Sequence, residues 1–239
     1  MANRLIKIER ISGALGAVIT GVDLKRPLDD ATIAEIRAAW LEHLVVFFRD
    51  QDLTPAEFLA FAQRFGALDE YPFVKGIEGF PQIIQVAKLE HERVNFGGIW
   101  HSDTTYLERP PMGAMLLARE VPPVGGDTLF ANMYLAYDAL SSGMKRLLDG
   151  LVGVSSSAKA DVSRTREDRI KDMSEEESAG LLQYLFQHQV RPEFTCRFAW
   201  KPGSMAFWDN RAAQHNPIND YHGQRRIMHR ISLAGDVPR

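Results

Sequence analysis

Residues 100–105, with the sequence WHSDTT, form the stretch around which the rest of the chain is organised. His101 and Asp103 lie two positions apart, so in an extended backbone both side chains leave the same face of the chain. An imidazole and a carboxylate placed in this way can share a metal ion, although the triplet alone also fits a histidine that is hydrogen-bonded near a strand end. Two histidines and one carboxylate hold divalent iron in non-haem oxygenases and leave the opposite face open. The stretch therefore predicts two ligands of such a site, and a second histidine must come from elsewhere.

Segments with the pattern of short strands surround this stretch. We expect strands within residues 5–20 and at residues 44–48, 83–86, 115–118, 194–200, 204–208 and 226–233, and a turn into a strand at residues 125–130. Helical spacing and candidate N-caps predict helices at residues 29–44, 54–65, 134–148 and 181–186, the third of them broken near residues 141–143. This order indicates an α+β fold with a double-stranded β-helix (jelly-roll) core and flanking helices. A doubly wound sheet is disfavoured, because strands and helices do not alternate regularly and no glycine-rich dinucleotide fingerprint follows a strand.

The composition is that of one ordinary globular domain. The chain has 239 residues, of which 45% are hydrophobic and 25% are charged, so we expect residues 1–239 to form a single domain with a sizeable core. A net charge of -3 gives no reason to expect nucleic acid or an anionic membrane as a partner. The single cysteine, Cys196, excludes an intrachain disulfide and fits a reducing compartment. Since no run of residues resembles a signal segment or a membrane helix, we expect a soluble cytoplasmic protein, and we also expect a homo-oligomer.

Residues 155–180 differ in kind from the rest of the chain. They are dense in Ser, Lys, Arg, Asp and Glu and hold few large apolar side chains, so they can contribute little to a core. Such a charged run is most simply a solvated surface or a mobile loop. The alternative is a lid that becomes ordered over a substrate.

The second histidine ligand has two main candidates. His215 follows the segment WDNR at residues 208–211, and His229 lies on the next predicted strand between arginines. The other histidines lack a comparable pattern, and His43 at an apolar helix end fits a packing role better than ligation. The residues themselves favour His215 only modestly.

Arg226 and Arg230 are unusual for a predicted core strand. They lie four positions apart, so they share one face, while Arg225 points to the other. A buried guanidinium is costly unless an anion meets it. Its planar fork suits a carboxylate, so two arginines facing one cavity suggest two anionic groups, such as a dicarboxylate cosubstrate and an anionic substrate. The alternative is that one or both arginines pair with an internal Asp or Glu.

Short motifs spread over nearly the whole chain carry a family resemblance. They are ITGVDL at 19–24, VVFFRDQ at 45–51, RFG at 64–66, WHSD at 100–103, GGDT at 125–128, WDNR at 208–211 with His215, and NDYHGQRRIMHR at 219–230. Each motif is weak alone, but their order and number make the set specific. The chain resembles the taurine dioxygenase (TauD/TfdA-like) family of iron(II)- and 2-oxoglutarate-dependent oxygenases, which includes dichlorophenoxyacetate dioxygenases and alkylsulfatases.

The resemblance implies roles for particular residues. His101, Asp103 and His215 would be the iron(II) ligands, which favours His215 over His229. Thr128 and Arg226 would hold the distal carboxylate of the cosubstrate 2-oxoglutarate. Arg230 would meet the anionic group of the substrate near the metal. The implied reaction uses O2 and hydroxylates a small anionic organic molecule, a sulfonate, an alkyl sulfate or a carboxylate, with release of succinate and CO2.

Three departures from the family pattern bear on the substrate. Tyr71 stands where the taurine enzymes place a histidine on the sulfonate, so Tyr71 becomes a candidate substrate residue and taurine itself is disfavoured. Residues 95–98 (NFGG) are less polar than the taurine version, which suits a bulkier or less polar substrate. The stretch from His101 to His215 is several tens of residues shorter than in the taurine enzymes, with the shortfall near residues 171–174. Either substrate cover has been lost, or the sequence omits residues at that point; we favour the second.

Two alternatives to this function are open from the sequence. Within the same family, the chain could be an aryloxyalkanoate-cleaving dioxygenase. Outside it, the chain could be a non-catalytic jelly-roll protein that binds a small carboxylate and keeps a vestigial metal motif. The complete set of two histidines and one carboxylate, with Thr128 and Arg226 retained, argues against the second alternative.

Overall fold

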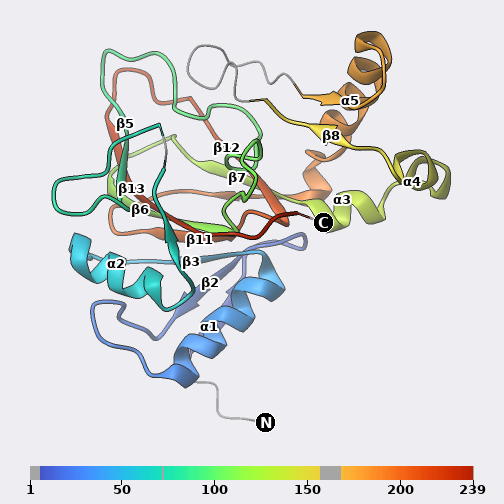
Figure 1. Ribbon diagram of the computed structural model, residues 1–239. Coiled ribbons are helices and arrows are strands. Elements are labelled where there is room, and N and C mark those ends of the chain that lie inside the picture. Colours follow the sequence, from blue (N-terminus) through green and yellow to red (C-terminus); the bar gives the residue numbers. More distant parts are fainter. Residues whose placement is uncertain (1–5, 72, 157–167, 239) are drawn as a thin grey trace.

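The computed structural model describes residues 6–71, 73–156 and 168–238, which fold into two main sheets with helices around them (Figure 1). The larger sheet has the order β1 (Lys7–Arg10), β2 (Ala17–Thr20), β3 (Val45–Phe48), β11 (Met205–Asp209), β6 (Gly113–Glu120), β13 (Arg226–Leu233) and β4 (Leu68–Asp69), and β5 (Ile84–Lys88) also pairs with β13. The smaller sheet has the order β10 (Thr195–Phe198), β7 (Thr128–Asn132) and β12 (Ala213–Pro217). Neighbouring strands are mostly far apart in sequence, and the predicted jelly-roll core is confirmed.

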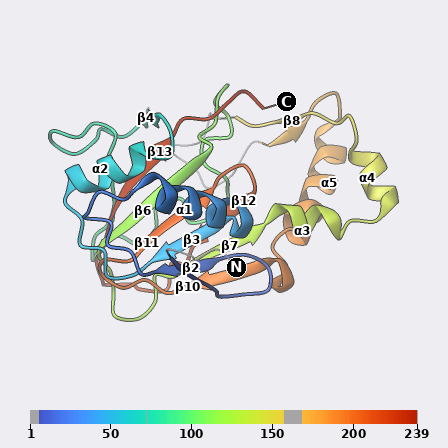
Figure 2. The same cartoon turned by 90° about the horizontal axis from the view of Figure 1, so that it is seen from below.

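Alternate residues of the central strands fill two separate cores. Val45 and Phe47 of β3 belong to the cluster shared with Phe130 of the smaller sheet, so they lie between the two sheets. Val46 and Phe48 belong to the cluster shared with α1 (Asp30–His43) and α2 (Pro55–Gln63). Figures 1 and 2 show these two helices together against one face of the larger sheet. The predicted site residues face the first of these cores, which lies between the two sheets.

Local sequence signals set the ends of the first helices. Asp29 caps α1 by accepting a hydrogen bond from the Thr32 amide, and Thr54 and Glu57 form a reciprocal capping box at the start of α2. Leu44 ends α1 with a φ of 63°, after which β3 begins. The predicted starts of both helices are therefore confirmed.

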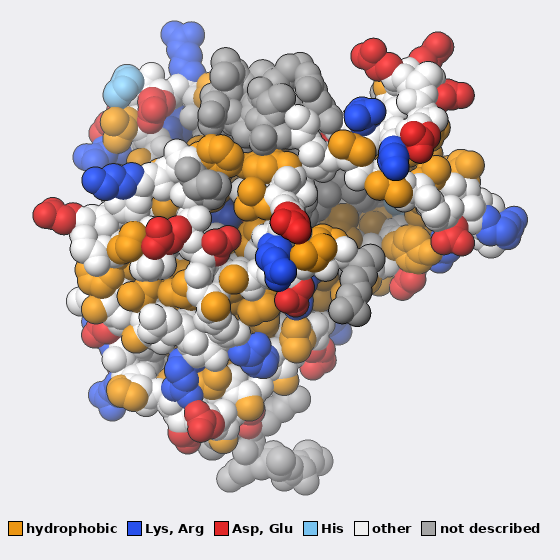
Figure 3. All heavy atoms as spheres, in the orientation of Figure 1, with side chains coloured by type: hydrophobic (Ala, Val, Ile, Leu, Met, Phe, Trp, Pro, Cys, Tyr) orange, Lys and Arg blue, Asp and Glu red, His pale blue; other side chains and the backbone are white. Residues whose placement is uncertain are grey.

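A helical arm extends from one side of the two sheets (Figure 1). It contains α3 (Met133–Asp138), α4 (Ser142–Leu148), the strand pair β8 (Gly153–Val154) and β9 (Arg169–Ile170), and α5 (Glu175–His188), which the short 3-10 helix η1 (Pro192–Phe194) joins to β10. The buried His188 contacts the Ala136 carbonyl oxygen through Nε2 at 2.7 Å and so ties α5 to α3. Figure 3 shows hydrophobic side chains on the surface of this arm, where the exposed ones include Tyr134, Tyr137, Leu147, Val152, Tyr184 and Phe186.

The polar segment at residues 155–180 is partly regular structure. Residues 169–170 form β9, and α5 begins at Glu175 behind a capping box formed by Ser174 and Glu177. Ile170 and Ser178 are both buried, and the Ile170 amide donates a hydrogen bond to Ser178 Oγ at 2.6 Å. The regular structure at residues 169–170 and from residue 175 contradicts a mobile loop there, but most side chains of residues 168–180 are exposed, as expected of a solvated surface. Residues 157–167 lie outside the described residues. None of the helices in the described ranges is long and apolar enough to cross a bilayer.

Candidate metal centre

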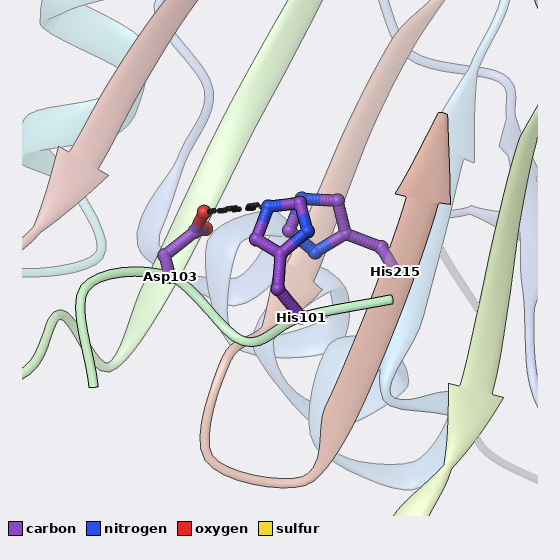
Figure 4. Close-up of side chains that lie close together, drawn as sticks. All are labelled: His101, Asp103 and His215. Carbon is purple, nitrogen blue, oxygen red and sulfur yellow. Dashed lines mark ion pairs between the residues drawn. The ribbon is translucent and has the colours of Figure 1, made fainter. Parts of the chain in front are cut away.

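His101 and His215 are held side by side by backbone pairing. The His101 amide donates to the His215 carbonyl at 3.0 Å, and the His215 amide donates to the His101 carbonyl at 2.9 Å. His215 lies in β12, whose partner β7 places Phe130 opposite it. Figure 4 shows the two rings next to each other, with centroids 4.1 Å apart. The structure therefore places His215 next to His101, as the predicted set of ligands requires.

Asp103 reaches the histidines from a turn. The sequence-based picture of an extended backbone through Asp103 is wrong, because His101 ends the bridge and residues 103–106 form a turn with Thr104 at a φ of 43°. The turn is fixed by Asn210, whose Oδ1 accepts from the Asp103 amide at 2.7 Å and whose Nδ2 donates to the carbonyls of Asp103 and Pro111 at 3.1 and 3.0 Å. The side chain still faces the two imidazoles.

The three side chains fit one metal ion. Asp103 Oδ1 lies 3.7 Å from His101 Nε2 and 3.8 Å from His215 Nε2, and one ligand atom from each residue lies within 4.8 Å of the others (Figure 4). His101 Nδ1 lies 2.7 Å from the Ile99 carbonyl oxygen, which fixes the proton on Nδ1 and leaves Nε2 as the donor atom. A side chain at position 97 would press on this ligand, since a Cβ on Gly97 would lie 3.0 Å from His101 Cε1. Two imidazoles and a carboxylate match the donor set of non-haem iron.

The charge of Asp103 suits a cation. Burial raises the pKa of its carboxyl, but the charges of Arg230 and the two histidines together hold that pKa below its usual value. Arg230 Nη2 lies 2.9 Å from Asp103 Oδ2 in an ion pair in which both side chains are buried. Of the two predicted alternatives for Arg230, pairing with an internal acid is thus present in this structure. Asp103 Oδ1 remains directed at the histidines.

Arg226 is buried without a carboxylate partner among the described residues. It is 6% exposed, its Nε and Nη2 have no hydrogen-bond partner in the described ranges, and burial lowers its pKa. Its Cζ lies 5.6 Å from the ring centroid of Trp200, whose Nε1 donates to Thr128 Oγ1 at 2.9 Å. Because that oxygen accepts from Trp200, the Thr128 hydroxyl proton is available for an anion. Arg226, Thr128 and Trp200 therefore form a buried donor cluster.

The motif GGDT positions Thr128. Gly125 and Gly126 have φ values of 84° and 69°, and a Cβ on Gly125 would lie 2.7 Å from Asp220 Oδ1. That same Asp220 oxygen accepts from the Gly126 amide at 2.7 Å. The turn needs both glycines, and it delivers Thr128 to the start of β7.

Tyr71 and Arg230 lie together at a mostly aromatic edge of the site. Arg230 Cζ lies 5.8 Å from the ring centroid of Tyr71. The Tyr71 ring contacts Phe73 and Phe96 at centroid distances of 5.8 and 6.4 Å, and Phe73 contacts Tyr106 at 6.0 Å. Phe73 and Phe96 are each 47% exposed, so this cluster leads from the surface towards Arg230.

Two residues of the site have no role in the sequence-based prediction. Asn210 lies inside the motif WDNR, so the motif itself was the available signal. Trp200 carries no local signal, because its contact with Thr128 joins segments that are distant in the sequence.

Asn210→Ala is expected to loosen the Asp103 turn. The change removes three buried hydrogen bonds, so we expect the free energy of unfolding to fall by about 1–3 kcal/mol. Because residues that orient metal ligands typically contribute about 10- to 100-fold to metal affinity, we expect a loss of that size for iron(II), measured by anaerobic titration. Asn219→Ala is the control, since Asn219 makes one exposed hydrogen bond to the Arg93 carbonyl. Unchanged iron affinity in Asn210→Ala would show that Asn210 does not position Asp103.

Comparison with known proteins gives one consistent result. The family model described as "Taurine catabolism dioxygenase TauD, TfdA family" matches residues 7–168 and 154–232. An alkylsulfatase of Acinetobacter baylyi is 30% identical over 97% of this chain and 86% of its own length. An alpha-ketoglutarate-dependent sulfate ester dioxygenase of Pseudomonas putida is 32% identical over 98% of this chain and 91% of its own. The crystal structure of a taurine dioxygenase from Burkholderia xenovorans superposes with a TM-score of 0.87 at 36% identity, over 98% of this chain and 93% of that one.

The relatives are longer than this chain inside the aligned region. The alignments with the two curated relatives run over 275 and 276 positions, whereas the chain has 239 residues. The two parts of the family match overlap at residues 154–168. Both findings fit the predicted shortfall between His101 and His215, and its position within that stretch stays a prediction.

Proposed function

The chain belongs to the taurine catabolism dioxygenase TauD, TfdA family, and from this premise we propose that His101, Asp103 and His215 hold iron(II). The enzyme is a 2-oxoglutarate-dependent dioxygenase, an oxidoreductase that acts on anionic organic molecules. Bound iron(II) with 2-oxoglutarate and O2 supplies the oxidant that hydroxylates a C–H bond, and succinate and CO2 are released. The residues of the chain bind and orient the reactants and exclude water around them.

Arg226 and Thr128 bind the distal carboxylate of 2-oxoglutarate in this proposal. The guanidinium of Arg226 is buried, its Nε and Nη2 have no hydrogen-bond partner among the described residues, and a carboxylate is the ligand that its planar fork fits best. Trp200 orients the Thr128 hydroxyl by donating to its oxygen. The donors are thus in place before the cosubstrate arrives, which lowers the entropic cost of binding it.

Arg230 and Tyr71 face the substrate. Arg230 holds Asp103 through Nη2, while its buried Nε has no hydrogen-bond partner among the described residues and can donate to an anionic group beside the metal site. The aromatic cluster of Tyr71, Phe73, Phe96 and Tyr106 would contact the apolar body of the same molecule. The substrate we propose is therefore an alkyl sulfate, a sulfonate or a carboxylate with an apolar body. The relatives named alkylsulfatase and sulfate ester dioxygenase support the sulfate ester.

The observation that carries this proposal is that one buried face of β13 contributes a side chain to each of two sites. Arg226 and Arg230 lie on one face of β13, with Arg230 on the metal ligand Asp103 and Arg226 beside Thr128. A protein that only binds a carboxylate would need Arg226 and Thr128, but it would not need Arg230 and the metal ligand Asp103. The alternative within the family is an aryloxyalkanoate-cleaving enzyme, which the aromatic cluster also fits.

A substrate panel tests the proposal. The protein is incubated in air with iron(II), 2-oxoglutarate and one of an alkyl sulfate, an alkyl sulfonate or an aryloxyalkanoate, and succinate is measured. We expect one of these anions to give the fastest succinate formation, at a rate above the rate measured without substrate. If aryloxy acids are preferred, the alternative assignment holds, and if no member of the panel raises succinate, the dioxygenase proposal fails. A cytoplasmic setting and a homo-oligomer remain predictions.

A further inference from the structure

Lys88 is a buried cation that the proposed function does not use. It is the last residue of β5 and the cross-strand partner of Arg226 in β13. Cross-strand partners share a face, so the two side chains leave the sheet on the same side, together with Met228 and Arg230. Lys88 is 2% exposed, and its Nζ has no hydrogen-bond partner among the described residues. Two adjacent buried cations therefore both have unsatisfied donors.

Among the described residues, Lys88 Nζ meets an aromatic face. Its Nζ lies 4.1 Å from the ring centroid of Tyr221, which is itself buried and whose hydroxyl donates to Asn95 Oδ1 at 2.7 Å. No carboxylate in the described ranges forms an ion pair with Lys88 or with Arg226. Like charges directly opposite each other in a sheet destabilise it, and an unpaired buried charge adds to that cost. The charge of Asp127 acts on Arg226 without forming an ion pair, and an anion between or beside the two cations would stabilise the arrangement further.

Tyr221 connects Lys88 to the cluster of Arg226 and Thr128. The ring of Tyr221 packs on the turn before Thr128, since a Cβ on Gly126 would lie 3.2 Å from its Cδ1. The charge of Arg226 also acts on the Tyr221 hydroxyl. Lys88 lies over the same ring, so Tyr221 relates Lys88 both to Arg226 and to the turn that carries Thr128. A carboxylate has two oxygens with about four acceptor positions, enough for all three donors.

We propose that Lys88 Nζ is a third donor to the distal carboxylate of 2-oxoglutarate. This inference rests on the proposed function, in which Arg226 and Thr128 bind that carboxylate. With Lys88 the pocket holds two positive charges for one carboxylate, so it selects a dicarboxylic 2-oxo acid over one that ends in a methyl group. Lys88 is in this account a binding residue that determines cosubstrate specificity.

The rival explanation is a purely structural role, in which Lys88 supports the Tyr221 ring and so holds Asn95. The two explanations differ in their dependence on the ligand. A residue that contacts the distal carboxylate affects 2-oxoglutarate but not 2-oxovalerate, which has a methyl group in place of that carboxylate. A residue that only supports the ring affects both ligands equally and lowers the melting temperature of the ligand-free protein.

The experiment is calorimetric titration of the iron(II)-loaded protein without O2, with 2-oxoglutarate and with 2-oxovalerate, for the wild type and Lys88→Met. We expect Lys88→Met to weaken 2-oxoglutarate binding by about 10-fold or more, since a charge-assisted hydrogen bond is lost, and to change 2-oxovalerate binding by less than about twofold. The melting temperature without ligand should stay the same or rise, because an unpaired buried charge is removed. Lys88→Gln is the second variant, with the same expected ranking.

Lys145→Met is the matched control. Lys145 Nζ lies 4.9 Å from the ring centroid of Tyr137 on the helical arm, so the change removes a similar lysine and tyrosine contact far from the site. It should alter neither affinity. Equal losses for both ligands in Lys88→Met, or no loss for 2-oxoglutarate, would overturn the inference while leaving the proposed function intact. If the wild type does not bind 2-oxoglutarate, the proposed function and the inference both fail.

Discussion

Asp103→Ala is expected to abolish succinate formation. The change removes the only carboxylate of the proposed iron ligands, and it leaves two histidines that together hold a divalent ion weakly. Altering a residue that merely supports a metal ligand lowers metal affinity or activity by about 10- to 100-fold. Removing a ligand should therefore lower turnover at fixed iron(II) by more than about 100-fold. The measurement is the initial rate of succinate release with the best anion of the panel.

A second variant separates iron binding from folding. Asp103→Ala also leaves the buried Arg230 without its ion-pair partner, and breaking a buried pair costs about 3–5 kcal/mol of stability. Asp103→Asn keeps the volume and an oxygen that can accept from Arg230, so it should lose less stability and still be inactive. Thermal unfolding of both variants gives the comparison. Turnover at the wild-type rate in either variant would refute the role of Asp103 as an iron ligand.

Arg226→Met is expected to raise the KM for 2-oxoglutarate far more than the KM for the substrate. Truncating one partner of a buried charge pair costs about 2–5 kcal/mol, which corresponds to a rise of roughly 30-fold or more. The stability of the protein without 2-oxoglutarate should not fall in this variant. Arg226 has no described anionic partner, so replacing it with an apolar side chain of similar size should keep or raise the melting temperature.

The controls for Arg226 are the preceding residue Arg225 and Arg230 on the same strand. Arg225→Met changes the preceding residue, which points to the other face and is paired with Glu90 and Glu120, so neither KM should change. Arg230→Lys keeps a charge beside Asp103 but loses the planar fork, and it should raise the KM for the substrate more than that for 2-oxoglutarate. The reverse ranking of Arg226 and Arg230 would mean that their roles are exchanged.

Much of the fold was predictable because the signals are local. Asp29 and Thr54 cap helices through neighbours three residues away, and the alternation in β3 and β13 places their side chains on two faces. The predicted limits of β13, residues 226–233, agree with the structure. Each of these features depends on a few consecutive residues, which a single sequence contains.

The remaining features depend on contacts between distant segments. β12, which carries His215, was not predicted as a strand, because its sequence AQHNP has no strand pattern and its pairing with β7 sets its conformation. The turn at Asp103 is held by Asn210, more than a hundred residues away. The pairing of Lys88 with Arg226 follows from the order of β5 and β13 in the sheet. Sheet order is a property of the whole chain, so no local pattern shows it.

Anaerobic addition of iron(II) and 2-oxoglutarate to the purified protein tests the central claim most directly. If His101, Asp103 and His215 hold iron(II) with 2-oxoglutarate bound to it, a visible charge-transfer absorption should appear only when both are present. The same addition to Asp103→Asn should give no band, and Arg226→Met should need more 2-oxoglutarate for half of the signal. A wild-type protein that shows no band, or an Asp103→Asn variant that retains it, would contradict the assignment.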